Sequence, residues 1–580
     1  MARPRSLDTI KNKSLEAKDF AKLDLNLEPG IKNTLFVNEN DRVYIGDPLA
    51  VGLPYDDAID DLRIAASSIT RNTGSFLFEL DANKEICIIK NGTNILFYQI
   101  NTGGGPMTYL SSLGIVTLAE NKEVYLEANF GSTEKAATTG YIKYVFLSLP
   151  KEAWVVAYNT RNGDWQVERV ASTYPNWAAA SARNLGDRRV PTVANGYYYE
   201  VTVAGTTAGV QPTWPTTIGN TVVDGTVTWV CRGRYNNYPT TTSASARILN
   251  GYVFVCVGGD IYNSDLDLPD SWNTSDFIST EIYPDDVVAL AKYKNYLVAF
   301  GTNTIEFFYD ASNTSGTPLA RQEGILHNIG CIGQGTVTDS EDVIYWISQT
   351  SSGTYSIWTL EKFEAKKVST PEIDVFLTRR INEVAILNPE YLNYYYMFVT
   401  RINGSLILCI PLFKTDSPNP TYISSILAVD FEKQAFYEWE LTSEGYDYIG
   451  KPVKFKSYYV YCTTTGTDII FVVLGLPRYE PTLGGSPQDL ILQSPSFETN
   501  PLDFGTNNYK VLNEISFNCF ASIATSSVFI SRDRASEISY PTPVGVYKVT
   551  RLGRAREFRI KFQDTKILSK IECKYTEHTN

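Results

Sequence analysis

Two groups of closely spaced aspartates are the first candidates for chemistry, because several carboxylates at short spacing can hold a cation. They are Asp56, Asp57, Asp60 and Asp61, and Asp265, Asp267 and Asp270. An EF-hand calcium loop that began at Asp56 would need glycine at its sixth position and glutamate at its twelfth. Asp61 and Ser67 stand there instead, and the second group fails the same test. We predict solvated acidic residues, with no metal site and no cofactor.

The chain offers little for nucleophilic catalysis. Its two histidines are His327 and His578, and it contains no G-x-S-x-G motif, so a Ser-His-Asp arrangement has almost no candidates. His327 is predicted to lie in a loop or at a subunit contact. The glycine-rich IGCIGQG (329–335) lacks the lysine of a phosphate loop and the glycine order of a dinucleotide site, which leaves tight turns at a strand edge.

Two further patterns bear on catalysis. SRDRASEISY (531–540) lacks the glycine and tryptophan of the sialidase Asp-box that it faintly resembles. The 64 acidic residues allow a carboxylate pair of the kind that hydrolyses glycosides, since spacing in sequence does not reveal such pairs. We predict no catalytic residue.

Eight cysteines stand singly in strand-like runs, for example Cys87 in ICIIK, Cys256 in FVCVGG and Cys409 in LILCIPL. Without a C-x-x-C pair they are predicted to be buried, reduced thiols that act as small hydrophobes. The N-terminus lacks the apolar core of a secretory signal. No stretch approaches the roughly 18 to 20 continuous apolar residues of a membrane span. These features predict a soluble chain that is made in a cytoplasm.

The net charge of −13 is unevenly placed. Residues 1–22 hold six Lys and Arg against three acidic residues, and residues 551–580 hold eight against four, which leaves −20 on residues 23–550. Tight DNA binding needs many Lys and Arg contacts to phosphate, which residues 23–550 do not favour. Their negative charge could line a passage through which DNA slides, or it could be an ordinary acidic surface. RLGRAREFRIKF (551–562) alternates apolar and basic residues. It could contact phosphate, but a sheet face beside acidic neighbours is the preferred interpretation.

Short β-type runs dominate the chain from about residue 62 onward. Examples are SFLFEL (75–80), NILFYQI (94–100), YVFVCV (252–257), VIYWIS (343–348) and DIIFVVLGL (468–476). Gly, Asn, Asp or Pro separates most of them at hairpin-like intervals, and 38 Tyr and 27 Phe suit a pleated, half-buried surface. Helical periodicity is found at 14–24 and 377–384. These patterns predict an all-β chain.

A weak repeat indicates the architecture. VVAYNTRNGDWQVE (155–168) and LAVDFEKQAFYEWE (427–440) share an apolar strand, a polar turn and an aromatic strand, with Trp165 and Tyr437 at equivalent places. VIYWIS followed by TYSIWTL (354–360) is a third such hairpin. Propeller blades show this pattern, although a sandwich built of hairpins would show it too. We favour a propeller.

Two segments interrupt the pattern. Residues 184–233 are rich in Thr, Gly and Val and contain few acidic residues, which predicts a compact hairpin module between proline-containing linkers. Five prolines between residues 477 and 501 mark a second boundary before the C-terminal strands.

An ordered series of aromatic, proline and aspartate residues runs through 261–374: Ser264-Asp265, Trp272, Phe277, Pro284-Asp285, LVAFGTNTIEFFYD (297–310), GTPLARQEGILHNIGCIGQGTV (316–337), VIYWISQTSSGTYSIWTLE (343–361) and KKVSTPEID (366–374). It resembles the core signature of podophage (podovirus) tail-nozzle proteins, or packaged-DNA stabilisation proteins. The 184–233 module is similar to a small β-unit of phage structural proteins. LDFGT (502–506) with RLGRARE (551–557) is similar to a strand domain that ends several phage tail proteins. The first 60 residues do not match the family's usual opening.

The resemblance implies a β-propeller that assembles as a homo-oligomer, typically a hexamer, below the portal and adaptor proteins of the head-to-tail connector. The ring would extend the DNA channel, retain the packaged genome and pass it during ejection, with only transient, non-specific contact with the duplex. Tail fibre, spike or needle proteins would be further partners. The implied location is the virion tail, after synthesis in the host bacterial cytoplasm, and the family brings no catalytic residue or cofactor.

The predicted fold is therefore all-β, with a β-propeller core, an inserted small β module and a C-terminal β-strand domain. Its expected parts are a partly helical N-terminal arm at 1–45, propeller at 46–175 and 241–490, the inserted module at 176–240 and the C-terminal strands at 491–580. Two alternatives stay open. A receptor- or glycan-binding propeller would expose Trp or Tyr pockets, and a polysaccharide-degrading enzyme would need two carboxylates in a cleft.

Overall fold

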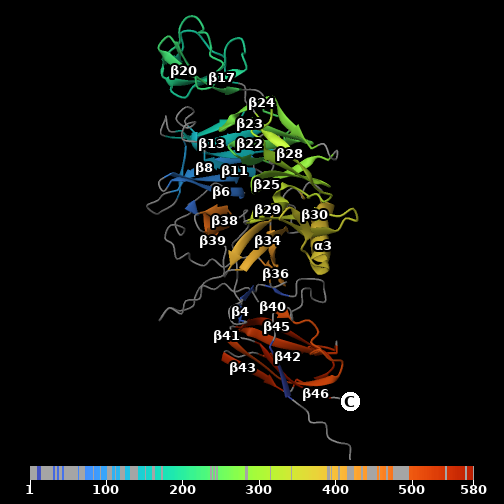
Figure 1. Ribbon diagram of the computed structural model, residues 1–580. Coiled ribbons are helices and arrows are strands. Elements are labelled where there is room, and N and C mark those ends of the chain that lie inside the picture. The colour runs from blue at the N-terminus through green and yellow to red at the C-terminus, as the bar shows by residue number, and fades with distance from the viewer. Residues whose placement is uncertain are drawn as a thin grey trace, which may run out of the picture. The chain divides into compact units, whose positions relative to one another are not determined.

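The computed structural model describes most of the chain between residues 72 and 578 and five short segments before it (Figure 1). The described residues are 10–14, 31–32, 35–37, 42–44, 63–64, 72–81, 84–91, 93–100, 107–111, 113–117, 125–130, 141–149, 152–159, 164–170, 174–234, 238–239, 242, 246–280, 285–313, 315–340, 342–387, 392, 395–402, 405–413, 423–432, 435–440, 453–455, 458–465, 468–473, 496–533, 535–541, 545–550, 552–567 and 571–578, with gaps of one residue at 112 and 534 among others. They fall into a terminal unit (Met1–Ser67, Ser351–Ser356 and Val368–Asn580) and a central unit (Ser68–Thr350 and Ile357–Lys367).

Five antiparallel sheets of the central unit follow one another in the up-and-down order typical of propeller blades. Their strands are β6 (Asn72–Asp81), β7 (Lys84–Asn91), β8 (Asn94–Gln99), β9 (Thr108–Tyr109) and β10 (Val116–Thr117); β11 (Tyr125–Phe130), β12 (Tyr141–Ser148), β13 (Ala153–Asn159) and β14 (Asp164–Arg169); β21 (Ala246–Leu249), β22 (Tyr252–Val257), β23 (Asp260–Asp265) and β24 (Leu268–Ser279); β25 (Val287–Tyr293), β26 (Tyr296–Gly301), β27 (Ile305–Asp310) and β28 (Leu319–His327); and β29 (Val337–Ser340), β30 (Val343–Gln349), β31 (Tyr355–Glu361) and β32 (Glu364–Lys367). The short 3-10 helix η3 (Gln334–Thr336) precedes β29.

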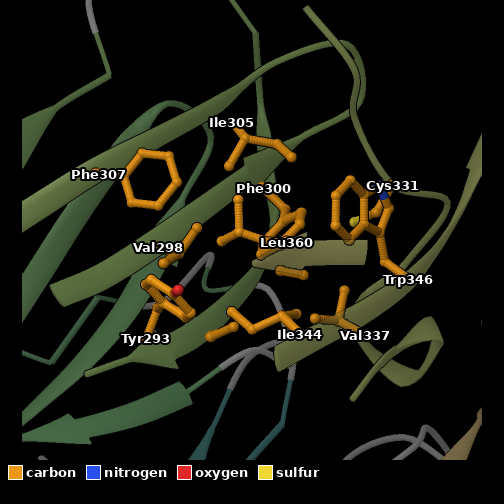
Figure 2. Close-up of a cluster of buried hydrophobic side chains, with 12 residues drawn as sticks. Tyr293, Val298, Phe300, Ile305, Phe307, Cys331, Val337, Ile344, Trp346 and Leu360 are labelled. Atoms are coloured by element: carbon orange, nitrogen blue, oxygen red, sulfur yellow. The ribbon is translucent and has the colours of Figure 1, made fainter. Parts of the chain in front are cut away.

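Apolar side chains pack between consecutive blades. Four buried clusters each join one sheet to the next, which explains why the inner strands are apolar on both faces. Figure 2 shows the cluster between β25–β28 and β29–β32, where Phe300 meets Trp346 with ring centroids 5.4 Å apart. Each such side chain contributes roughly 1.5–3 kcal/mol when it is fully buried, so the blades stabilise one another.

Between β14 and β21 the chain forms a separate module, drawn in green in Figure 1. Its strands are β15 (Ala182–Arg183), β16 (Arg188–Arg189), β17 (Tyr197–Val203), β18 (Gly205–Thr206), β19 (Thr221–Asp224) and β20 (Val227–Arg234). The main sheet has the order β16-β17-β20-β19, and β15 pairs with β18. Tyr199, Trp229 and Cys231 belong to its own core. The buried Asp224 accepts the indole N–H groups of Trp177 (2.7 Å) and Trp229 (3.0 Å), so the module also has buried hydrogen bonds of its own.

The terminal unit contains two more four-strand arrays of the same kind. They are β33 (Phe398–Ile402), β34 (Ser405–Phe413), β35 (Ile423–Asp430) and β36 (Ala435–Glu440), and β37 (Val453–Phe455), β38 (Tyr458–Thr465) and β39 (Asp468–Val473) with β5 (Arg63–Ile64). The helix α3 (Pro371–Leu387) begins with proline at its first position, where a missing N–H costs nothing. Its buried Phe376, Leu377, Ile381 and Val384 form one apolar face.

The C-terminal strands form a long sheet within the terminal unit. They are β40 (Ser496–Glu498), β41 (Tyr509–Arg532), β42 (Ile538–Pro541), β43 (Gly545–Thr550), β44 (Arg554–Ala555), β45 (Phe558–Ile567) and β46 (Glu572–His578), joined by β1 (Ile10–Ser14) and β2 (Ile31–Lys32). β1 pairs with β46, and β2 lies between β36 and β40. A separate hairpin consists of β3 (Leu35–Val37) and β4 (Arg42–Tyr44).

The all-β propeller fold predicted from sequence is confirmed, and the helix predicted at 377–384 is the longer α3. In the predicted N-terminal arm at 1–45 the described residues form the strands β1 to β4. β1 pairs with a strand from the other end of the chain, and a local sequence window cannot detect such a partner. Most of the helix predicted at 14–24 lies outside the described residues. In the part of the chain that the structure describes, no helix has the length and apolarity to cross a membrane.

Candidate functional site

Five charged residues meet where the inserted module contacts the blades. β16 places Arg188 directly opposite Glu200 on β17, so both point to the same face of the sheet. Arg232 lies at a shift in the β17–β20 register, two residues beyond the β20 partner of Glu200, and its guanidinium contacts Glu200. The blade strands β14 and β24 supply Glu168 and Asp270. We call these five residues the junction network.

Arg188 is the centre of the junction network. Its Nη2 is 3.1 Å from Glu200 Oε2, its Nη1 is 3.3 Å from Asp270 Oδ2, and it also contacts Glu168. Arg232 donates to both oxygens of Glu200, with Nη2 2.5 Å from Oε1 and Nε 3.0 Å from Oε2. Arg188, Arg232, Glu200 and Asp270 each expose 7% of their surface or less. Buried charges of this kind persist only when they are paired.

Two tyrosines cover the network. Tyr198 donates its hydroxyl hydrogen to Asp270, and its ring lies 5.1 Å from the guanidinium carbon of Arg188. Tyr174 stacks on Tyr198 with ring centroids 4.7 Å apart. Burial raises the pKa of Tyr174 well above its usual range, although Arg188 lies close by, so the hydroxyl stays neutral. The rings exclude water, which strengthens the attraction between the ion pairs.

Most polar atoms of the junction network contact one another; among the described residues the buried Asp270 Oδ1 has no hydrogen-bond partner, and the Glu168 side chain is 23% exposed. Both oxygens of Glu200 contact guanidinium groups, and Asp270 Oδ2 is shared by Arg188 and Tyr198. A catalytic acid or a metal ligand must face a substrate or an ion, whereas these groups face one another. Removing one partner from a buried ion pair costs about 3–5 kcal/mol. The arrangement is therefore suited to holding the module against the propeller blade.

The aspartates singled out in the sequence have different environments. Asp270 is buried, so the prediction that it is solvated is wrong; Arg188 from the distant module compensates its charge. Asp265 accepts a hydrogen bond from Ser271 (2.6 Å), and Asp267 occupies the turn between β23 and β24 with a φ of 55°. The other group, Asp56, Asp57, Asp60 and Asp61, lies outside the described residues. Within the described ranges, no group of three or more His, Cys, Asp or Glu could hold a metal ion.

Asp285 organises a tight turn of the β25–β28 sheet. Its carboxylate accepts hydrogen bonds from the N–H groups of Asn303 (2.7 Å) and Thr304 (3.0 Å) and from the hydroxyl groups of Thr302 and Thr304. Burial opposes ionisation of this carboxyl, but the hydrogen bonds outweigh burial and lower its pKa. The Asp285 carboxylate therefore accepts its hydrogen bonds from the turn that it organises.

His327 is the last residue of β28, which pairs as far as Ile305↔His327, so it does not lie in a loop; a subunit contact at His327 stays a prediction. Its Nε2 lies 3.0 Å from the carbonyl oxygen of Phe363 in the next sheet. In the glycine-rich segment, Gln334 donates to the carbonyl of Leu290 (3.3 Å) and accepts from its N–H (2.9 Å). The segment therefore joins two blades through turns, in agreement with its structural interpretation.

The basic strand predicted near the C-terminus is β44 and β45. Phe558, Ile560 and Phe562 are fully buried, and Arg559 Nη1 lies 3.4 Å from Glu498 Oε1 on β40. This confirms an apolar face and a basic face beside an acidic neighbour. His578 ends β46.

The remaining candidates also serve the fold. In SRDRASEISY, Asp533 Oδ1 accepts the N–H groups of Arg556 (2.8 Å) and Glu557 (3.0 Å), so it caps a turn. Six cysteines are buried in the described part of the chain: Cys87, Cys231, Cys256, Cys331, Cys409 and Cys573.

One comparison with known proteins matches most of the central blades to a family model. Residues 122–392 match the family model described as Bacteriophage P22 Gp10, beta-propeller. Over these residues the chain is similar to that phage family. The match contains β11 to β14, the module, β21 to β32 and α3, and so it includes the signature at 261–374 on which the resemblance depends.

The P22 Gp10 family match is not extended by other comparisons. No curated protein matches the chain. Similar solved structures include BBS1N in complex with ARL6DN (9% identity, 77% of this chain and 98% of that chain, TM-score 0.33). Others are an ancestral GH74 enzyme (12%, 78% and 79%, TM-score 0.25) and an exo-beta-1,3-galactanase from Phanerochaete chrysosporium (8%, 91% and 100%, TM-score 0.21). At these TM-scores the similarities carry no functional argument.

Within the P22 Gp10 family region the signature residues are structural. Trp272 is 1% exposed and donates to the carbonyl of Pro269 (2.8 Å), while Phe277 stacks on Tyr262 at 5.2 Å. The sequence does not predict the junction network, because its members are spread over more than one strand and more than one sheet. One available signal is a charged residue inside an apolar strand, as with Glu200 in YYYEVTV.

Proposed function

We propose that the chain is a structural tail-nozzle protein of a short-tailed bacteriophage. It assembles as a homo-oligomeric ring, a hexamer, below the portal and adaptor proteins of the virion. The ring extends the DNA channel, retains the packaged genome and passes it during ejection.

The observation that carries this proposal is the family match at 122–392, which falls on four blade sheets and the module between them. The described side chains support a structural role in a second way. The charged groups at the module junction, in the Asp285 turn and at His327 all contact groups of the same chain. A protein that must keep its shape against the pressure of packaged DNA benefits from such internal contacts.

The mechanism is steric and electrostatic. Residues 23–550 carry a net charge of −20, and a wall of like charge keeps the phosphate backbone from binding. The duplex therefore makes only transient, non-specific contact as it moves through the ring, and a constriction holds it before ejection.

The module is proposed to meet a tail fibre, spike or needle protein. It exposes Val193 (81%) and Val210 (80%), and apolar side chains are favoured at the centre of protein interfaces.

Electron microscopy of the full chain mixed with its phage's portal and adaptor proteins tests the proposal. A ring that caps the portal–adaptor complex, together with less DNA released from capped heads than from uncapped heads, is the expected result. A monomer that ignores the complex would contradict the proposal. It would favour the glycan-binding alternative, which predicts exposed Trp or Tyr pockets. All nine tryptophans lie in the described ranges, and none of them is exposed.

A further inference from the structure

Several basic side chains around the C-terminal sheet are neutralised by carboxylates of the same sheet. The ion pairs are Lys11–Glu577 (2.6 Å), Lys574–Glu514 (2.9 Å), Lys548–Glu514 (3.6 Å) and Arg559–Glu498 (3.4 Å). These four cations are therefore paired within the sheet.

Arg554 and Arg556 differ from these residues. Both are exposed, and neither forms an ion pair with any carboxylate in the described part of the chain. Their guanidinium carbons lie 4.8 Å and 4.9 Å from the centroid of one ring, that of Tyr509. Two like charges beside one ring repel each other, and the negative face of the ring offsets only part of that repulsion.

The backbone beneath this pair is fixed. Lys510, which follows Tyr509 on β41, is fully buried and donates from Nζ to the carbonyl oxygens of Asn508 (2.8 Å) and Arg556 (3.1 Å). Asp533 accepts the N–H of Arg556 (2.8 Å). Because the N–H and C=O groups of Arg556 are both held, the backbone needs little reordering when a ligand binds there.

We propose that Arg554, Arg556 and Tyr509 form a docking site for a protein segment that presents neighbouring carboxylates. A guanidinium plane held against a ring keeps its N–H edge free for two parallel hydrogen bonds to a carboxylate. Duplex DNA is held instead by many unneutralised cations along its backbone, and four basic residues of this region are already paired. The inference rests on the proposed function in one respect, since that assembly supplies the partner protein.

Isothermal titration of the full chain with an eight-residue glutamate peptide tests the site, with an eight-residue glutamine peptide as the uncharged probe. We expect the glutamate peptide alone to bind, and Arg554→Gln/Arg556→Gln to weaken it about tenfold. Arg554→Lys/Arg556→Lys keeps the charge but loses the planar donors, so binding should weaken about threefold. Lys548→Gln, in the same sheet, should change binding less than about 1.5-fold because Lys548 is already paired.

Equal binding by the wild type and the double glutamine variant, with unchanged melting temperatures, would overturn the proposal. A 20-base-pair duplex that binds more tightly than the peptide and is lost in that variant would also overturn it, since the site would then be for nucleic acid. Electron microscopy of the wild type with portal and adaptor separates the two proposals. If no ring forms on the portal and adaptor, the proposed function is contradicted. The peptide titration tests only the docking site and does not depend on that result.

Discussion

Replacing Arg188 with methionine should reduce the free energy of unfolding by about 3 kcal/mol, which is roughly a 100-fold change in the equilibrium constant. The variant leaves three acidic residues beside one remaining cation. Glu200 keeps Arg232, whose Nη2 lies 2.5 Å from its Oε1, so the cost arises mainly at Asp270 and Glu168. Tyr198 still donates to Asp270, which places the loss near the lower end of the usual range for a broken buried pair.

Urea unfolding of the full chain, followed by tryptophan fluorescence, measures this loss because Trp177, Trp214 and Trp229 all lie in the module. Arg189→Met is the matched control. Arg189 is partly exposed and lies 3.9 Å from Asp187, so its loss should cost less than about 1 kcal/mol. Equal effects of the two substitutions, or a loss below about 1 kcal/mol for Arg188→Met, would refute the reasoning.

Three further predictions concern other parts of the chain. The side-chain hydrogen bond from Lys11 is the main reason that the pKa of Glu577 is lowered to about 2; Lys11→Gln should move this pKa up towards its usual 4.3, as carboxyl-carbon NMR would show. Because the folded pKa is depressed, the pairing stabilises above pH ~4.3 and is lost as the pH falls through about 2, so wild type and variant should converge in urea resistance there. Burial raises the pKa of the Cys331 thiol to about 12, so iodoacetamide at pH 8 should label it only after unfolding, as peptide mass mapping would show; labelling of the native protein contradicts this. Gly330→Ala should lower stability by about 1–3 kcal/mol in urea, since a Cβ there would lie 2.1 Å from a backbone carbonyl, whereas Gly333→Ala meets nothing within 4 Å and should be nearly neutral.

Local patterns predicted the hairpins but not their registers. The copies at 155–168 and 427–440 are the hairpins β13–β14 and β35–β36, as expected. Trp165 lies opposite Tyr158, whereas the equivalent Tyr437 lies opposite Ala428. Alternation and turn residues determine that two strands pair, while the exact register also depends on the neighbouring blades.

The junction network was beyond prediction from sequence for a different reason. Asp270 follows a proline and two other aspartates in the chain, and that context is typical of a solvated turn. Its burial depends on Arg188, which is 82 residues away and belongs to an inserted module. The apolar face of β45 was predictable, because Phe558, Ile560 and Phe562 alternate within one strand.

The strand β5 completes a sheet whose other three strands are β37, β38 and β39, with Arg63 paired to Ile470. A ribosome must therefore add roughly 400 residues after β5 before its partner exists, and a loop of that length is costly to close early in folding. During synthesis the blades of the central unit can pack first, since each needs only the next few dozen residues. A chain truncated before Ile470 would leave β5 with an unpaired edge, the kind of edge that promotes aggregation. Closure of this sheet therefore requires that the ribosome has already translated the chain past Ile470.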